Sequence, residues 1–179
     1  MPKSWELTFM GDVVDIISGV SYSKEDIRKS GIRILRGGNI QDGHIINTTD
    51  DIYIDGVYRN KLNAVTKGDI VLVASTGSQT LIGKTGYANE SLQDTQIGAF
   101  LRIIRPKLLD ISPFLNIVFS SNYYKNYIRD LAKGTNINNV KNGYIEKFCF
   151  AMPPIEEQRR IVAIIKDLFA TIDSIIAEL

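Results

Sequence analysis

A glycine-rich segment with a lysine and two threonines is the first place to look for chemistry. Its sequence, GSQTLIGKT at residues 77–85, is similar to that of a phosphate-binding P-loop. A P-loop has four residues between its first glycine and Gly-Lys-Thr, because its backbone N–H groups must converge on the phosphates. Here five residues intervene, and Gly86 and Tyr87 indicate a strand where a helix should begin. A P-loop nucleotide-binding protein therefore stays only as a minor alternative.

The chain has one histidine, His44, and one cysteine, Cys149. A zinc site with the usual nitrogen and sulfur ligands is therefore excluded. A Ser-His or Cys-His nucleophilic pair is also excluded, unless His44 is the histidine of that pair. The sequence MPPI at residues 152–155 lacks the amide and the aromatic residue of the adenine methyltransferase motif, and no glycine-rich cofactor motif precedes it. We therefore expect that this chain is not an enzyme and needs no cofactor or metal.

Polar loops that contain glycine are the stronger candidates for function. They span residues 19–23, 36–41, 75–84 and 135–142. Arginine and lysine can bind guanine edges, asparagine and glutamine suit adenine, and serine and threonine suit phosphates. For each residue taken alone, the role of a simple turn former is the favoured interpretation. The candidate DNA-binding residues are Tyr22, Arg36, Asn39, Gln41, Ser75, Thr76, Gln79, Lys84, Asn136 and Asn138.

These loops must be held by a folded domain, and the strand signals crowd the middle of the chain. Apolar runs and alternation predict strands at residues 32–35, 52–54, 70–74 and 96–104. Ser112 and Pro113 predict the start of a helix that continues to Leu131. Residues 5–19 predict a short helix or strand that enters the core. The expected fold class is a mixed α/β (α+β) domain with a mixed, twisted sheet over residues 1–150.

A long helix is expected over residues 151–179. Pro153 and Pro154 suit a first helical turn, and Glu156 and Glu157 suit the positive end of the helix dipole. Packing on its own domain is the ordinary role of such a helix. However, the apolar residues alternate at spacings of four and three, which is the a/d register of a coiled coil, so we expect pairing with another helix. The pairing residues would be Ile161, Ile165, Leu168, Ile172, Ile175 and Leu179.

Composition indicates one ordinary globular domain with an appended helix. The 179 residues are 44% apolar and 23% charged, with a formal net charge of +1. We see no membrane span and no signal peptide, and a single cysteine fits a cytoplasmic location. Stand-alone DNA-binding domains tend to be visibly basic. Near-neutrality therefore favours a module that reads DNA inside a larger assembly.

The sequence also resembles a known family. The string PPIEEQRRIV at residues 153–162 resembles the element that opens the conserved helix of specificity subunits in Type I restriction-modification systems. Four further segments agree in order with that family. They are DVVDIISG, IRILRGGNI, KGDIVLVASTGSQTLIGKTG and GTNINNV, at residues 12–19, 32–40, 67–86 and 134–140.

The resemblance implies a target recognition domain that binds double-stranded DNA, followed by a spacer helix. It implies a methyltransferase subunit that docks near Glu157, Gln158 and Arg159 and brings S-adenosylmethionine, and a restriction subunit that brings ATP-dependent cleavage. This chain would direct both to a bipartite site. Family members usually carry two such domains and two helices, so a chain with one of each would be a self-pairing half-subunit or a fragment. The alternative from another class is an adaptor or oligomerisation module that does not bind DNA.

Overall fold

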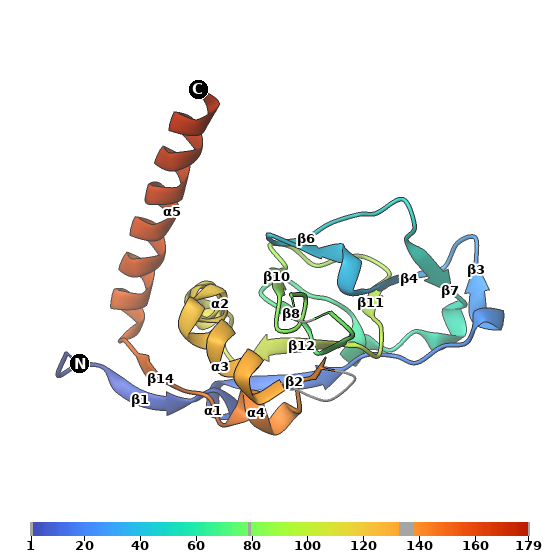
Figure 1. Cartoon of the computed structure of the whole chain (residues 1–179), viewed down its shortest axis with the longest axis horizontal. Coiled ribbons are helices and arrows are strands. Elements are labelled where there is room, and N and C mark those ends of the chain that lie inside the picture. The colour runs from blue at the N-terminus through green and yellow to red at the C-terminus, as the bar shows by residue number, and fades with distance from the viewer. Residues whose placement is uncertain (1, 79, 133–137, 179) are drawn as a thin grey trace.

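The computed structural model describes residues 2–78, 80–132 and 138–178, and a six-stranded mixed sheet lies at its centre (Figure 1). Only β10 and β6 pair in parallel in this sheet. The strand β8 has the sequence IVLV and is buried on both faces, as a continuous apolar run predicts. In spatial order the strands are β2 (Val14–Ser18), β12 (Leu101–Pro106), β8 (Ile70–Val73), β10 (Thr85–Tyr87), β6 (Gly43–Ile45) and β5 (Ile40–Gln41).

A four-stranded sheet and two short ladders complete the strands. In the four-stranded sheet β11 and β4 are parallel, and the other pairs are antiparallel. Its order is β11 (Thr95–Ile97), β4 (Ile32–Leu35), β7 (Ile52–Ile54) and β3 (Ile27–Arg28). The ladders are β1 (Glu6–Phe9) with β14 (Cys149–Met152), and β9 (Ser75–Thr76) with β13 (Asn138–Asn139). The predicted mixed α/β fold class is confirmed.

Helices cover one face of the central sheet. On that face Ile70, Leu72 and Ile104 pack with Phe119 and Tyr124, and the opposite face forms a second apolar cluster with Leu35 and Ile97. The α-helices of the domain are α1 (Met10–Val13), α2 (Ser112–Ser120), α3 (Asn122–Ala132) and α4 (Asn142–Glu146). Short 3₁₀ turns are η1 (Lys24–Asp26), η2 (Gly37–Asn39), η3 (Gly56–Tyr58), η4 (Lys61–Asn63) and η5 (Leu109–Ile111).

Two predicted elements are each divided in the structure. The strand predicted at residues 96–104 is β11 and β12, which lie in different sheets, because a turn at residues 98–100 reverses the chain. The helix predicted from Ser112 to Leu131 is α2 and α3. Ser121 is extended between them, and its hydroxyl donates to the Val118 carbonyl and accepts from the Tyr124 amide. Leu131, an apolar residue near the end of α3, is exposed.

The long helix α5 (Ile155–Ala177) projects from the domain, at the end of the molecule opposite β3 and β7 (Figure 1). The Pro154 carbonyl accepts from the amides of Glu157 and Gln158 and so starts the helix. The helix therefore begins later than the predicted residue 151, because Ala151 and Met152 pair with β1 as part of β14. Ile155, Ile161 and Val162 pack on the core of the domain. Among the described residues, no helix is long and apolar enough to cross a membrane.

Candidate nucleic-acid interface

The turn at residues 98–100, called here the 98–100 turn, connects three strand ends. The Val20 amide, just after β2, donates to the carbonyl of Ile97 (2.9 Å). The Gly98 amide donates to the carbonyl of Leu35 at the end of β4 (2.9 Å). The Phe100 carbonyl accepts from the backbone after β8, where the amides of Ala74 and Ser75 donate at 2.9 Å and 3.0 Å. These bonds bring three of the four polar loops to one edge of the domain.

The fourth loop reaches the same edge through β13. Asn138 pairs with Thr76 and Asn139 pairs with Ser75 in an antiparallel ladder, and the Val140 amide donates to the Ala74 carbonyl (2.7 Å). The candidate residues Ser75, Thr76 and Asn138 are therefore neighbours. Gln79 and Asn136 lie outside the described residues. Lys84 is nearby, because the Val73 amide donates to its carbonyl.

Asn39 is a structural residue in the loop that follows β4, which corrects its prediction as a DNA contact. Its side chain is 1% exposed, and its Oδ1 accepts from the Arg36 amide at 2.8 Å. Its Nδ2 donates to Asp51 Oδ1 at 2.7 Å and to the Ile46 carbonyl at 3.1 Å. The amide group therefore fixes the loop against residues 46–51 and does not face solvent.

Three arginines between residues 28 and 36 are paired with acidic residues. Burial alone would raise the pKa of Asp51, but the hydrogen bonds that its carboxylate accepts, first from Thr48 and Asn39, outweigh burial and hold the pKa below its ordinary 3.8. Hydrogen bonds from Arg36 likewise lower the pKa of Asp50. The ion pairs are Arg28–Asp55 at 3.5 Å, Arg33–Asp51 at 2.7 Å and Arg36–Asp50 at 2.6 Å.

Two further candidates belong to the loops that follow β2 and β4. Tyr22 is half-buried against the apolar cluster that includes Ile32 and Ile54. Gln41 is exposed in β5, at the edge of the six-stranded sheet, and its amide donates to the Gly38 carbonyl at 3.0 Å. The structure thus brings Arg36, Ser75, Thr76, Lys84 and Asn138 near the turn, and Tyr22 lies two residues after Val20, which forms a bridge with Gly98.

Two residues at the turn were missed by sequence reasoning. Phe100 is 68% exposed, although it lies between polar loops. The guanidinium of Arg102 donates to the Ala99 carbonyl at 2.9 Å and to Asn142 Oδ1 at 3.2 Å, and no carboxylate of the described residues forms an ion pair with it. The sequence signal for Phe100 was an apolar residue directly after two small residues, Gly98 and Ala99. That signal was missed because the strand predicted at residues 96–104 included all three residues.

The P-loop alternative is not supported by the backbone of residues 80–87. Gly83 has a left-handed φ of +74°, and its amide donates to the Val73 carbonyl in the sheet. Thr85 begins the strand β10, so no helix N-terminus follows the lysine. Among the described residues, no three histidine, cysteine or carboxylate side chains are grouped as metal ligands.

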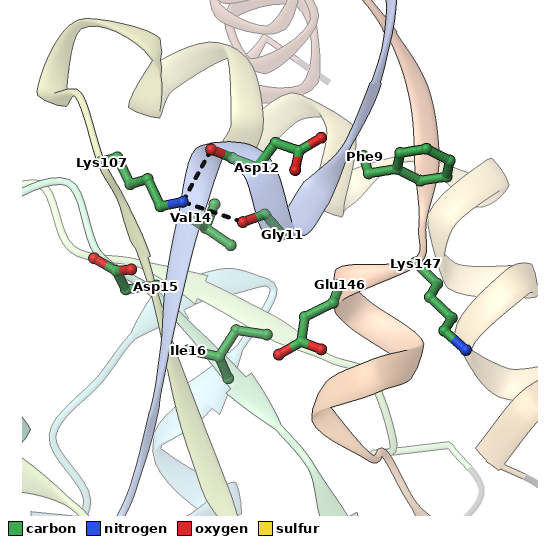
Figure 2. A pocket seen from close by; sticks show the side chains of 9 residues that line it. All are labelled: Phe9, Gly11, Asp12, Val14, Asp15, Ile16, Lys107, Glu146 and Lys147. Carbon is green, nitrogen blue, oxygen red and sulfur yellow. Dashed lines mark hydrogen bonds between the residues drawn. The ribbon is translucent and has the colours of Figure 1, made fainter.

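A surface pocket of about 560 Å³ lies elsewhere, between α1, β2 and α4 (Figure 2). Lys107 Nζ donates there to the carbonyls of Gly11 at 3.2 Å and Asp12 at 3.0 Å. Its lining has three carboxylates and two ammonium groups and contains none of the candidate DNA-binding residues, so the pocket is not part of the candidate interface. The charged residues that line it are Asp12, Asp15, Glu146, Lys107 and Lys147.

The predicted docking residues on α5 differ in exposure. Gln158 is 2% exposed, and its Nε2 donates to the Pro153 carbonyl at 2.8 Å, so its role is structural and the docking prediction for it is corrected. Glu157 accepts two hydrogen bonds from Arg160, which lower its pKa. Arg159 is exposed and pairs with Glu156 at 2.7 Å and Asp110 at 3.2 Å.

The predicted pairing stripe of α5 is covered only at its start. Ile161 packs on the domain and Ile165 is half-buried. Leu168, Ile172 and Ile175 are exposed, and Leu179 lies outside the described residues.

Comparison with known proteins finds type I specificity subunits that are similar to nearly the whole chain. The chain is 30% identical over 178 residues to the type I restriction enzyme EcoKI specificity subunit of Escherichia coli, which covers 97% of this chain and 38% of that protein. It is 28% identical to the StySPI specificity subunit of Salmonella potsdam, covering 100% of this chain and 39% of the relative. The chain therefore spans well under half the length of these relatives.

Solved structures show the same fold. The crystal structure of the HsdS subunit from Thermoanaerobacter tengcongensis matches with a TM-score of 0.71 at 21% identity, over 97% of this chain and 39% of that one. A structure from a study of type I R-M system assembly matches with a TM-score of 0.72 at 23% identity. The match covers 98% of this chain and 40% of that chain. The model of the type I restriction modification DNA specificity domain matches residues 2–179, so the chain belongs to that family.

Proposed function

We propose that this chain is a sequence-specific DNA recognition module of a type I restriction-modification enzyme and carries no catalytic centre of its own. The observation that carries the proposal is the convergence of the four polar loops on the 98–100 turn. A fixed edge with arginine, lysine, serine, threonine and asparagine side chains suits double-stranded DNA, where such groups bind base edges and phosphates. Membership of the DNA specificity domain family supports the same conclusion.

In this proposal the helix α5 assembles the enzyme. Its exposed stripe of Leu168, Ile172 and Ile175 would pair with a helix of a second copy or of another subunit. Glu157 and Arg159 remain accessible for a methyltransferase subunit, and a restriction subunit would join the same assembly. Two recognition domains held by paired helices would then read a bipartite site, with half-sites at a fixed spacing.

The charge distribution supports a module that relies on partners for affinity. The net charge is +1, and Arg28, Arg33 and Arg36 are paired within the chain. Because the net charge is close to zero and these three arginines are already paired, the chain alone should bind DNA with a shallow salt dependence. Specificity would come from the loops, and much of the phosphate binding would come from the other subunits.

An adaptor that does not bind DNA is the second candidate, since the exposed stripe of α5 would serve oligomerisation equally well. Selection of the full chain against a random pool of DNA duplexes distinguishes the two. The recognition module enriches one short sequence motif over successive rounds. An adaptor enriches none, whether the chain is tested alone or after it has been mixed with a type I methyltransferase subunit.

A further inference from the structure

The 98–100 turn holds an exposed phenylalanine in a fixed position. Phe100 is 68% exposed, yet its carbonyl accepts hydrogen bonds from Ala74 and Ser75. The turn is closed by the Leu101 amide, which donates to the Gly98 carbonyl at 2.9 Å. Because the backbone on both sides of the ring is bonded to the sheets, little conformational entropy remains to be lost when the ring binds a partner.

The surroundings of the ring indicate what it contacts. Ser75 and Thr76 lie beside the turn, and the Arg36 loop follows the strand that is bonded to Gly98. Arg102 follows two residues later, and among the described residues it has no carboxylate partner. A polar, cationic edge of this kind favours a nucleic acid over an apolar protein surface.

In the grooves of B-DNA the base edges offer hydrogen-bonding atoms and one apolar group, the thymine 5-methyl, which lies in the major groove. We propose that Phe100 is a specificity-determining residue that contacts a thymine methyl group in the target sequence, while Arg102 places an uncompensated positive charge beside the adjacent phosphates. The inference rests on the proposed function. It adds the residue that reads the DNA, the base that it contacts and the groove in which the contact is made.

The test uses the full chain and the duplex that it enriches from the random pool. Each thymine of that duplex is replaced in turn by uracil, which removes only the methyl group. The wild-type chain is expected to bind one of the uracil duplexes about fourfold more weakly, as the loss of one buried methyl group predicts. Phe100→Ala should bind the thymine duplex about tenfold more weakly, because it removes the apolar surface that the ring buries, and should no longer distinguish thymine from uracil at that position.

Leu108→Ala is the matched control. Leu108 is 66% exposed and follows the other end of β12, away from the polar loops, so its variant should behave as wild type. Phe100→Leu keeps an apolar side chain and should retain part of the discrimination.

The inference is overturned if Phe100→Ala keeps the wild-type discrimination at every thymine, if Leu108→Ala loses as much, or if the enriched motif has no thymine on either strand. In each case DNA recognition itself stands. A wild-type chain that enriches no motif overturns both the role of Phe100 and the proposed DNA recognition.

Discussion

Gly19 lies so close to Gly98 that a Cβ atom on Gly19 would overlap the Gly98 carbonyl oxygen. Gly19 follows β2 of the central sheet, and Gly98 follows β11 of the four-stranded sheet. The contact therefore joins the two sheets at the edge where the polar loops meet. Only glycine allows this approach, which gives the family-like DVVDIISG segment a structural reason for its last residue.

Gly19→Ala tests this contact. The added methyl group must displace the 98–100 turn, so the variant should lose about 1–3 kcal/mol in the free energy of unfolding and should bind the enriched duplex more weakly. Urea denaturation and DNA titration measure the two effects. Gly56→Ala is the control, because a Cβ there meets nothing within 4 Å. Equal stability of the two variants would show that the close approach is not a constraint.

Asp51→Asn tests the buried ion pair with Arg33. The pKa of Asp51 is lowered in the folded chain, so its contribution to stability is present above the unfolded pKa and is lost as the pH falls through the folded pKa. The variant should be less stable at pH 7 by about 1–3 kcal/mol, and the difference from wild type should shrink below about pH 4. Thermal unfolding between neutral and acidic pH measures this. A difference that stays constant with pH would contradict it.

Gln158→Ala tests the attachment of α5. The substitution leaves the Pro153 carbonyl without its buried donor and removes packing at the start of the helix, which should cost about 1–3 kcal/mol. Hydrogen exchange should increase in the first turns of α5, whereas Arg159→Ala, at an exposed position, should leave exchange there nearly unchanged. Indistinguishable exchange in the two variants would count against a structural role for Gln158.

Ile172→Asp tests whether α5 pairs. Ile172 is 48% exposed and lies beyond the part of α5 that packs on the domain, so aspartate there should dissociate the assembly and leave the domain folded. Ile161→Asp should instead destabilise the domain, because Ile161 packs on its core. Sedimentation over a range of concentrations measures the association. A wild-type chain that is monomeric at every concentration would rule out self-pairing.

Much of the fold follows from local sequence signals. The strands at Ile32–Leu35 and Ile52–Ile54 and the start of α5 are visible in the sequence because apolar periodicity and proline act locally. The division of 96–104 is not, because Ala99 and Phe100 fit a strand and only tertiary bonds to Leu35 and Ala74 fix the turn.

The sequence predicts which residue types could form the candidate site, but it does not predict which of those side chains lie together at the surface. Asn39 and Gln158 have side chains that suit binding, yet each is buried and bonded to nearby backbone. Burial depends on how distant segments pack, which a single sequence does not reveal. Phe100 shows the reverse case, since an apolar residue type predicts burial and the fold leaves it exposed.

The ratio of affinities for the enriched duplex and for a scrambled duplex of the same composition tests the central claim most directly. It should be measured for wild type and for a triple variant in which alanine replaces Arg36, Lys84 and Phe100, the residues near the turn that are expected to contact base edges. Wild type should prefer the enriched duplex by a factor of about 10³ or more, and the variant should bind both duplexes with nearly equal affinity while it remains folded. A folded triple variant that keeps the full wild-type ratio would contradict the assignment of DNA reading to the edge around the 98–100 turn.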